Sequence, residues 1–370
     1  ARWRGRSDVL VRLEGHGRAE EMVAGADLSR TAGWFTSMYP VRLQLTEIDA
    51  AEAVAGGAAA GRALKAVKEQ LRAVPDKGVG YGLLRHLNAE TAAELAGLPE
   101  PQIGFNYLGR VSLADLPAEL RTTGWEPAAD GADLVAAPDA DMPALSALEI
   151  NTVATDTGAG TELTAHLGFP TGVLRRDEVE ELAALWIEAL AGLVRHAAED
   201  GAGGMTPSDA PLVRVGQAEL EEWEGRFGRL AEVWPLTPVQ KGLLFHAMLA
   251  GASFDVYHMQ LVFHLSGRVE AERMRAAGQC LLERYANLRA AFVPGADGDP
   301  VQVVPESVRL PWRYLDLSGQ DDGALEAFLA EDRATHFDPA VPPLLRLALV
   351  RRGEERFELV VTAHHVLFDG

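Results

Sequence analysis

The residues at the end of the sequence include types that can do acid–base chemistry. Two adjacent histidines, His364 and His365, stand before Asp369 and Gly370. An imidazole ordinarily titrates near neutral pH, so one ring could accept a proton while its neighbour and the aspartate hold the turn rigid. Two histidines in a turn can also be satisfied polar groups without a chemical role, and the pair alone leaves both interpretations open.

A second candidate group lies near the start of the sequence. The apolar run from Val9 to Leu13 leads into Glu14, and Gly15 and Gly17 then flank His16. Glycines permit a tight turn, so Glu14 is expected at the end of a strand. A solvated loop with neighbouring charges is the alternative interpretation.

Alternating and three- to four-residue apolar spacings predict the elements that position these groups. The histidine pair should follow a strand over Arg356–Ala363, which turns sharply at Asp369 and Gly370. Further strands are predicted at Gln102–Arg110, Leu148–Val153, Glu162–Leu167 and Tyr257–Leu265, with Trp34 and Phe35 in a core strand. Helices are predicted at Ala50–Val74, Asp177–His196, Gln217–Leu230 and Glu270–Tyr285, and one starting with Thr237 as N-cap and Pro238 as first residue.

Composition limits the class of protein. The 370 residues are 24% charged and 48% hydrophobic, which suits a soluble chain of two or three domains. No apolar run approaches a membrane span, and the first residues do not read as a signal peptide. The single cysteine, Cys280, cannot form an internal disulfide, so a cytoplasmic location is expected. A formal charge of −20 argues against nucleic acid as a partner, and no metal site is expected.

Glycines and prolines mark three stretches that are expected to be loops or linkers. The glycine-rich run from Pro75 to Leu84 lacks the Gly-Lys-Ser/Thr ending of a phosphate-binding loop, so that interpretation is rejected. An acidic, proline-containing loop is expected from Pro127 to Pro143. Glycines and prolines between His196 and Arg214 predict an interdomain linker.

Four stretches in the first half resemble, in order, the motifs that close an epimerization domain of a nonribosomal peptide synthetase. They are Glu14 to Arg18, Arg30 to Pro40, Pro75 to Leu84 and Phe105 to Gly109. Small departures are Ala19 after the first motif, Ala32 within the second and Arg110 after the fourth. The lobe of that family that carries its own His-His-x-x-x-Asp-Gly motif is expected before these motifs, and residues 1–370 leave no room for it.

From Trp234 onward the sequence resembles the N-terminal lobe of a condensation domain of the same synthetases. Leu236 to His246 matches the opening motif, Arg284 to Arg289 matches Arg-His-x-x-Leu-Arg with Tyr285 in place of the histidine, and His364 to Gly370 matches His-His-x-x-x-Asp-Gly. The resemblance implies an α/β fold with two chloramphenicol-acetyltransferase-like lobes, each a mixed sheet with flanking helices. It divides the chain into residues 1–199, a linker at 200–232, and residues 233–370.

The resemblance implies a synthetase fragment, with the complementary lobe of each domain outside residues 1–370. Its reactions would be epimerization of a carrier-bound thioester and joining of a D-residue donor to an L-aminoacyl acceptor. The partners would be carrier domains whose phosphopantetheine arms tether the substrates, with no cofactor bound directly. His365 would accept or position the amine proton beside His364, and Asp369, next to Gly370, would pair with Arg289.

For epimerization, Glu14 is a candidate acid or base, provided partial burial raises its pKa. The family points to Tyr107 as donor to the enolate oxygen. Arg284, Asn106 and His16 are expected to give structural support. Three alternatives remain: a noncatalytic carrier-docking or scaffold piece, an acyltransferase that uses acyl-CoA, and a permuted pseudo-domain in which the two lobes pack together.

Overall fold

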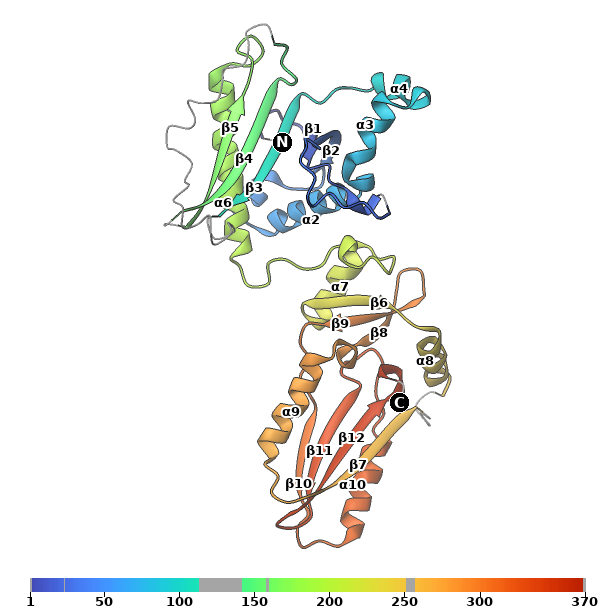
Figure 1. The fold of residues 1–370 in the computed structure, drawn as a ribbon. Coiled ribbons are helices and arrows are strands. Elements are labelled where there is room, and N and C mark those ends of the chain that lie inside the picture. Colours follow the sequence, from blue (N-terminus) through green and yellow to red (C-terminus); the bar gives the residue numbers. More distant parts are fainter. Residues whose placement is uncertain (1, 23, 113–141, 158–159, 251–256, 369–370) are drawn as a thin grey trace. The chain divides into compact units, whose positions relative to one another are not determined.

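The chain forms two compact units in a computed structural model, Ala1–Ala202 and Gly203–Gly370 (Figure 1). The structure describes residues 2–22, 24–112, 142–157, 160–250 and 257–368. Residues 127–141 of the predicted acidic loop, and Asp369 and Gly370, lie outside these ranges.

The first unit is built on a five-stranded mixed sheet with the strand order β2-β1-β3-β4-β5. β3 runs parallel to its neighbours β1 and β4, and the two outer pairs are antiparallel. The predicted strands at 102–110, 148–153 and 162–167 are confirmed, the last two as an antiparallel pair. The bounds are β1 Asp8–Gly15, β2 Ser37–Gln44, β3 Ile103–Val111, β4 Leu148–Thr157 and β5 Gly160–Gly168.

The helices of this unit confirm one prediction and correct another. α6 (Arg176–Ala197) agrees with its predicted range. The helix predicted from Ala50 to Val74 is instead two helices, α1 (Ala50–Ala55) and α2 (Ala58–Arg72), because Gly56 takes a left-handed conformation with φ 92°. Trp34 is 91% exposed and precedes β2, so its predicted place in a core strand is wrong.

The glycine-rich run at 75–84 forms a short 3₁₀ turn, η2 (Pro75–Gly78), and the start of α3 (Val79–His86). α4 (Ala89–Ala96) follows, with the side chain of Asn88 accepting a hydrogen bond from Glu90 N at its first turn.

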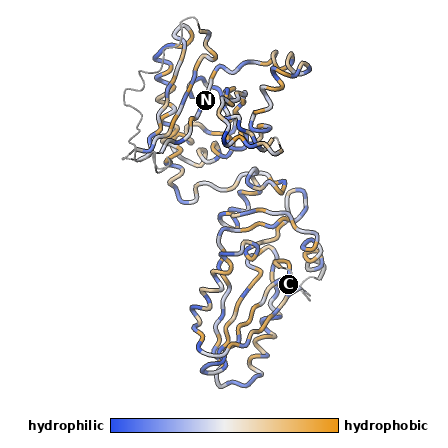
Figure 2. Tube along the Cα trace, viewed as in Figure 1, coloured by the Kyte–Doolittle hydropathy of each residue, from blue (hydrophilic) through white to orange (hydrophobic). Residues whose placement is uncertain are grey.

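The second unit contains a four-stranded sheet with the order β10-β11-β12-β7 and a three-stranded sheet with the order β6-β9-β8. Figure 2 shows the hydrophobic residues concentrated along the strands of the larger sheet. The strands are β6 Leu230–Pro235, β7 His258–Ser266, β8 Ala291–Pro294, β9 Pro300–Pro305, β10 Trp312–Asp316, β11 Leu345–Arg351 and β12 Arg356–His364. The helices include α7 Gln217–Phe227, α8 Pro238–Ala250, α9 Ala271–Arg284 and α10 Asp322–Ala334.

The four-stranded sheet packs against a helix on each face. Along β11, Leu345 and Leu347 share a core with Leu282 of α9, whereas Ala348 and Val350 share a core with Phe328 of α10. Successive residues of a strand point to opposite faces, so β11 is apolar on both sides. β12 lies inside this sheet, between β11 and β7, and its end is therefore held firmly.

The range assigned to a linker, 200–232, carries regular structure in the second unit from residue 203 onward. Leu220 and Trp223 of α7, three residues apart on one helix face, are buried with Val233 of β6 and Val303 of β9. The helix predicted from Gln217 to Leu230 is confirmed as α7, whose apolar face packs on the three-stranded sheet.

Candidate functional site

The histidine pair lies where β12 ends and a short 3₁₀ turn, η8 (His365–Leu367), begins. His364 is 0% exposed, and its Nδ1 accepts a hydrogen bond from the backbone N–H of Val366 at 3.0 Å. An accepting Nδ1 places the proton of the neutral ring on Nε2. His365 is only half-buried, and its backbone N–H donates to the carbonyl of Tyr257 at 2.9 Å. The two rings thus differ in access: His364 is buried and holds the turn, whereas His365 stays partly accessible to solvent.

Arg284 is the last residue of α9, and Arg289 lies in the following 3₁₀ turn, η7 (Ala286–Arg289). Arg289 is buried, and its guanidinium donates to the carbonyls of Leu282 (2.5 Å), Glu283 (2.9 Å) and Pro305 (2.9 Å). Arg284 stacks over the ring of Tyr285 with 5.6 Å to the ring centre. The pairing of Arg289 with Asp369 stays a prediction, because Asp369 is outside the described residues.

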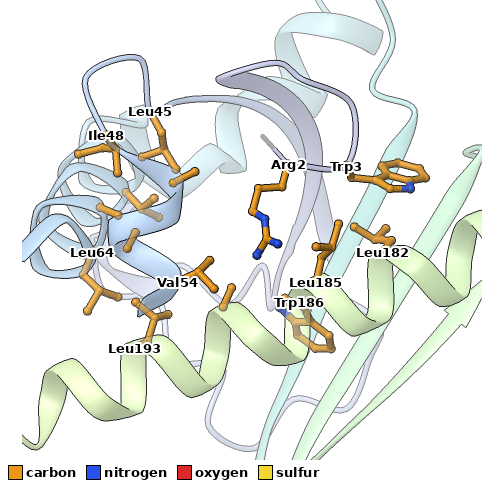
Figure 3. A pocket seen from close by; sticks show the side chains of 15 residues that line it. Arg2, Trp3, Leu45, Ile48, Val54, Leu64, Leu182, Leu185, Trp186 and Leu193 are labelled. Carbon is orange, nitrogen blue, oxygen red and sulfur yellow. The ribbon is translucent and has the colours of Figure 1, made fainter. Parts of the chain in front are cut away.

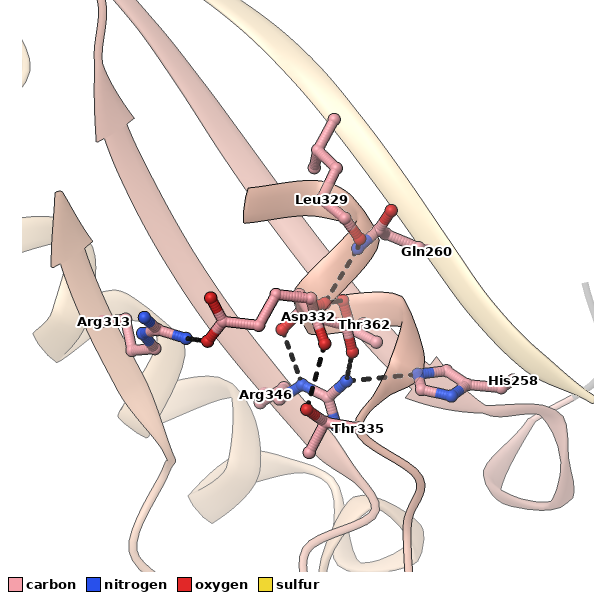
Figure 4. Close-up of polar contacts among 9 residues, drawn as sticks. His258, Gln260, Arg313, Leu329, Asp332, Thr335, Arg346 and Thr362 are labelled. Atoms are coloured by element: carbon pink, nitrogen blue, oxygen red, sulfur yellow. Dashed lines mark hydrogen bonds and ion pairs between the residues drawn. The ribbon is translucent and has the colours of Figure 1, made fainter. Parts of the chain in front are cut away.

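A buried ionic network between Asp332, Arg346 and Thr362 stands on the α10 face of β12 (Figure 4). The carboxylate of Asp332, 5% exposed, accepts from Arg346 Nε at 2.8 Å, Thr362 Oγ1 at 2.6 Å and Gln260 Nε2 at 2.8 Å. Thr362 precedes His364 by two residues, so both side chains point to the same face of β12. This network supports the strand end that carries the histidines.

The network also sets the charge state of Asp332. Burial opposes ionisation, but hydrogen bonds from Arg346, Thr362 and Gln260 hold the pKa of Asp332 below its ordinary value. Arg346 reaches His258 Nε2 at 3.3 Å and stacks over Phe337. The sequence analysis missed Asp332, because an acidic residue within a helical pattern carries no sign of burial.

In the first unit, the candidate residues of two motifs meet on one face of the sheet. The side chain of Asn106 in β3 donates to Glu14 Oε2 at 3.0 Å, although the residues are 92 positions apart. Glu14 is exposed, so the expected partial burial is absent in this structure. His16 Nδ1 accepts from the backbone N–H of Arg18 at 3.0 Å, a contact that holds the turn.

Tyr107 lies next to Asn106 in β3 and is 54% exposed. Alternation along the strand directs neighbouring side chains to opposite faces, so Tyr107 leaves the sheet on the side away from Asn106 and Glu14. The register of β3 shifts directly after Tyr107, between this residue and Arg110. The structure therefore brings Glu14 and Asn106 together and does not bring Tyr107 to them.

The face that carries Glu14 holds a polar row that the sequence analysis missed. The strand registers place Asn106, Asn151 and His166 side by side on β3, β4 and β5. One residue pair further along, Arg12 of β1 and Glu149 of β4 form an ion pair that spans β3. Gly104 lies between them, and a Cβ atom there would come within 1.9 Å of Glu149 Oε2. The glycine thus leaves room for a charge pair between strands that are not adjacent.

An apolar pocket of about 440 Å³ lies between α1, α2 and α6 of the first unit (Figure 3). Leu64, Leu182 and Trp186 are among its lining residues, and Arg2 points into it while paired with Glu188 at 2.8 Å. None of the candidate residues named from the sequence lines this pocket.

In the described ranges, no three of the side chains that commonly bind metals come together in a metal-ligating group. No helix there is long and apolar enough to cross a membrane. Cys280 is exposed and is not part of a disulfide.

The mixed α/β sheets and the histidine-bearing turn at the end of a buried strand are the features on which the family comparison bears. The family model for the condensation domain matches residues 1–210 and 230–370. The chain belongs to this condensation-domain family, and the α/β fold expected from the resemblance is confirmed.

Similar proteins are large peptide synthetases. Bacitracin synthase 3 of Bacillus licheniformis is 30% identical over 371 residues, and chondramide synthase of Chondromyces crocatus is 33% identical over 414. A component of the linear gramicidin synthase of Brevibacillus parabrevis is 38% identical over 378 residues. The chain is matched over 99%, 100% and 100% of its length, but it spans only 6%, 10% and 7% of these relatives.

Among solved structures, the epimerization domain from the third module of tyrocidine synthetase B is 27% identical with a TM-score of 0.40, covering 53% of this chain and 39% of that one. The starter condensation domain of rhizomide synthetase is 21% identical with a TM-score of 0.35, covering 37% and 35%.

Proposed function

We propose that the chain is part of a modular nonribosomal peptide synthetase. Residues 1–199 form the C-terminal lobe of an epimerization domain, residues 233–370 form the N-terminal lobe of a condensation domain, and residues 200–232 join them. Each lobe is of the chloramphenicol acetyltransferase type. The observation that carries this proposal is the 3.0 Å hydrogen bond between Asn106 and Glu14, because it joins two motifs of the epimerization type at one place.

In the condensation reaction, the amine of an acceptor attacks the thioester carbonyl of a donor. A C–N bond forms, the C–S bond breaks, and the phosphopantetheine thiol leaves while the amine loses a proton. His365 accepts or positions that proton, since its ring is accessible and its turn is held by buried His364. Substrates are carried by the phosphopantetheine arms of partner carrier domains, and the complementary lobe closes the site.

In the epimerization reaction, a proton leaves the carbon next to a thioester and returns on the opposite face. Glu14 acts as one acid–base group, and the amide of Asn106 fixes the direction of its carboxylate. The opposing histidine is proposed to belong to the complementary lobe, whose approach would also bury Glu14 and raise its pKa. Tyr107 is proposed to donate to the enolate oxygen. Its exposure and its position on the other face make it the weaker of the two assignments.

The test of condensation uses the native polypeptide that carries residues 1–370, with donor and acceptor thioesters on separate carrier proteins. We expect a dipeptidyl carrier product with a D-donor and far less with an L-donor, and a His365→Ala loss of about 10²- to 10⁴-fold. Carrier binding without product would favour the scaffold alternative. Product formed only from acyl-CoA would favour the acyltransferase alternative.

The test of epimerization is separate and measures deuterium uptake at the α-carbon of a carrier-bound aminoacyl or peptidyl thioester in heavy water. Glu14→Gln should abolish uptake while condensation of a supplied D-donor continues. Uptake that survives Glu14→Gln would remove Glu14 from the mechanism. Tyr107→Phe in the same assay decides whether its phenol takes part.

A further inference from the structure

Two side-chain amides from distant segments cap the turn that carries His365. Gln240 in α8 donates through Nε2 to the carbonyl of Val366 at 3.0 Å. Asn287 in η7 donates through Nδ2 to the carbonyl of Leu367 at 3.0 Å. Carbonyls in a single helical turn lack the partners that a longer helix would supply, so these two amides provide them.

Gln240 is itself held from two sides. Its side-chain Oε1 accepts from the backbone N–H of Thr237 at 3.0 Å, and its backbone N–H donates to Thr237 Oγ1 at 3.2 Å. This reciprocal pair is the capping box of α8. Gln302 in β9, 5% exposed, exchanges hydrogen bonds with the Gln240 amide at 3.0 and 3.1 Å. The amide that reaches Val366 therefore has little freedom to turn.

The backbone of the turn around His365 is thus fixed through its N–H groups and its carbonyls. His364 receives the N–H of Val366, Tyr257 receives the N–H of His365, and the two amides hold the carbonyls that follow. The side chains of Val366 and Leu367 are buried at 1% and 4% exposure. His365 is the residue of the turn that keeps partial access, and the bonds on both sides of it fix the backbone from which its side chain extends.

We propose that Gln240 and Asn287 are positioning residues for the imidazole of His365. This assignment rests on the proposed condensation function. A reacting base must lie within hydrogen-bond reach of its proton, and a displacement of about 1 Å can cost about 100-fold in rate. Removing either amide takes the bond from a carbonyl of the turn and lets the backbone that carries the ring shift.

The chain offers a matched control. Thr237→Val removes the hydroxyl that caps α8 but keeps the Gln240 amide that reaches Val366. Gln240→Met removes the donor to Val366 and the acceptor of the Thr237 N–H, while the backbone N–H of residue 240 still donates to the Thr237 hydroxyl. Gln240→Glu keeps an acceptor for the Thr237 N–H while removing the donor. Asn287→Leu removes the second donor. Loss of stability and loss of positioning are therefore separable.

The first readout is the NMR signal of the His365 imidazole and its rate of modification by diethyl pyrocarbonate, measured on residues 1–370. Gln240→Met, Gln240→Glu and Asn287→Leu should each change both quantities. Thr237→Val should leave them at wild-type values even where it lowers the melting temperature. His264, which is 82% exposed at its side chain, serves as an internal reference that no variant should alter.

The second readout is condensation kinetics in the native polypeptide. Gln240→Met and Asn287→Leu should lower kcat about 10- to 100-fold with KM within about twofold. An unchanged His365 signal with unchanged kcat would overturn the positioning role. If the variants alter the His365 signals but the wild-type polypeptide forms no peptide bond, the positioning is upheld and the proposed function is refuted instead.

Discussion

Replacing Asp332 with asparagine should destabilise the second unit strongly, since the new amide cannot satisfy the network. One carboxylate oxygen accepts from Arg346, and the other accepts from Thr362 and Gln260. If the amide NH₂ of asparagine replaced the oxygen that accepts from Arg346, two donors would face each other there. If it replaced the other oxygen, it would face the NH₂ donor of Gln260. Asp332→Asn therefore leaves the Arg346 charge without its anion in either orientation.

The magnitude follows from the burial of the pair. The side chains of Arg346 and Asp332 are 15% and 6% exposed. Breaking a buried pair by removing one partner costs about 3–5 kcal/mol. For a unit of this size, that loss lowers the melting temperature by roughly 6–20 °C.

The dependence on pH gives a second signature. The pKa of Asp332 is below its ordinary value in the folded state, so its carboxylate contributes stability above the unfolded pKa. That contribution is lost as the pH falls through the folded pKa. The stability difference between wild type and Asp332→Asn should therefore be full at neutral pH and shrink in acid below the ordinary pKa.

The assay is urea unfolding, with hydrogen exchange of β12 amides as the probe of the second unit. Asp316→Asn is the control, because Asp316 pairs with Arg351 at 3.2 Å where both side chains are substantially exposed. The free energy of unfolding of Asp316→Asn should stay close to that of wild type. If the free energy of unfolding of Asp332→Asn equalled that of wild type at neutral pH, the expected loss would be refuted. A difference that persisted unchanged in strong acid would refute the role of the carboxylate.

The remaining predictions concern the first unit. Gly104→Ala should lower the melting temperature of this unit, because the new Cβ would lie 1.9 Å from Glu149 Oε2 and displace Glu149 from Arg12. Gly82→Ala is the control and should not lower the melting temperature, because a Cβ there meets nothing within 4 Å. A melting curve unchanged by Gly104→Ala would contradict the spanning ion pair. The pKa of Asp156, lowered to about 2 chiefly by the hydrogen bond from Arg110, should rise toward 3.8 in Arg110→Gln, as followed by NMR titration. If the pKa of Asp156 did not rise in this variant, groups other than Arg110 would be responsible for lowering it.

Periodicity in the sequence predicted regular elements well where the spacing was long and uninterrupted. The helix predicted at 177–196 agrees with α6, and the strand predicted at 257–265 agrees with β7 within one residue at each end. The start of α8 was equally readable: the Thr237 hydroxyl accepts from the backbone N–H of Gln240 as the predicted N-cap, and Pro238 is the first residue. These features depend on residues close together in the chain.

The errors have local causes that periodicity does not register. Gly56 and Gly57 interrupt an apolar spacing that continues across them, so one predicted helix became two. The aromatic Trp34 suggested a core strand, although it stands in solvent.

By itself, the sequence determined the family, the α/β class, and the motifs that contain His365 and Glu14, because these depend on residue types at short spacings. Only the tertiary structure decided which histidine is buried and that Asn106 meets Glu14. It also placed Gln240 and Asn287 on the carbonyls of the histidine turn. The physical reason is that such contacts join segments far apart in the chain. They depend on strand register and on the packing of whole elements, which no local pattern specifies.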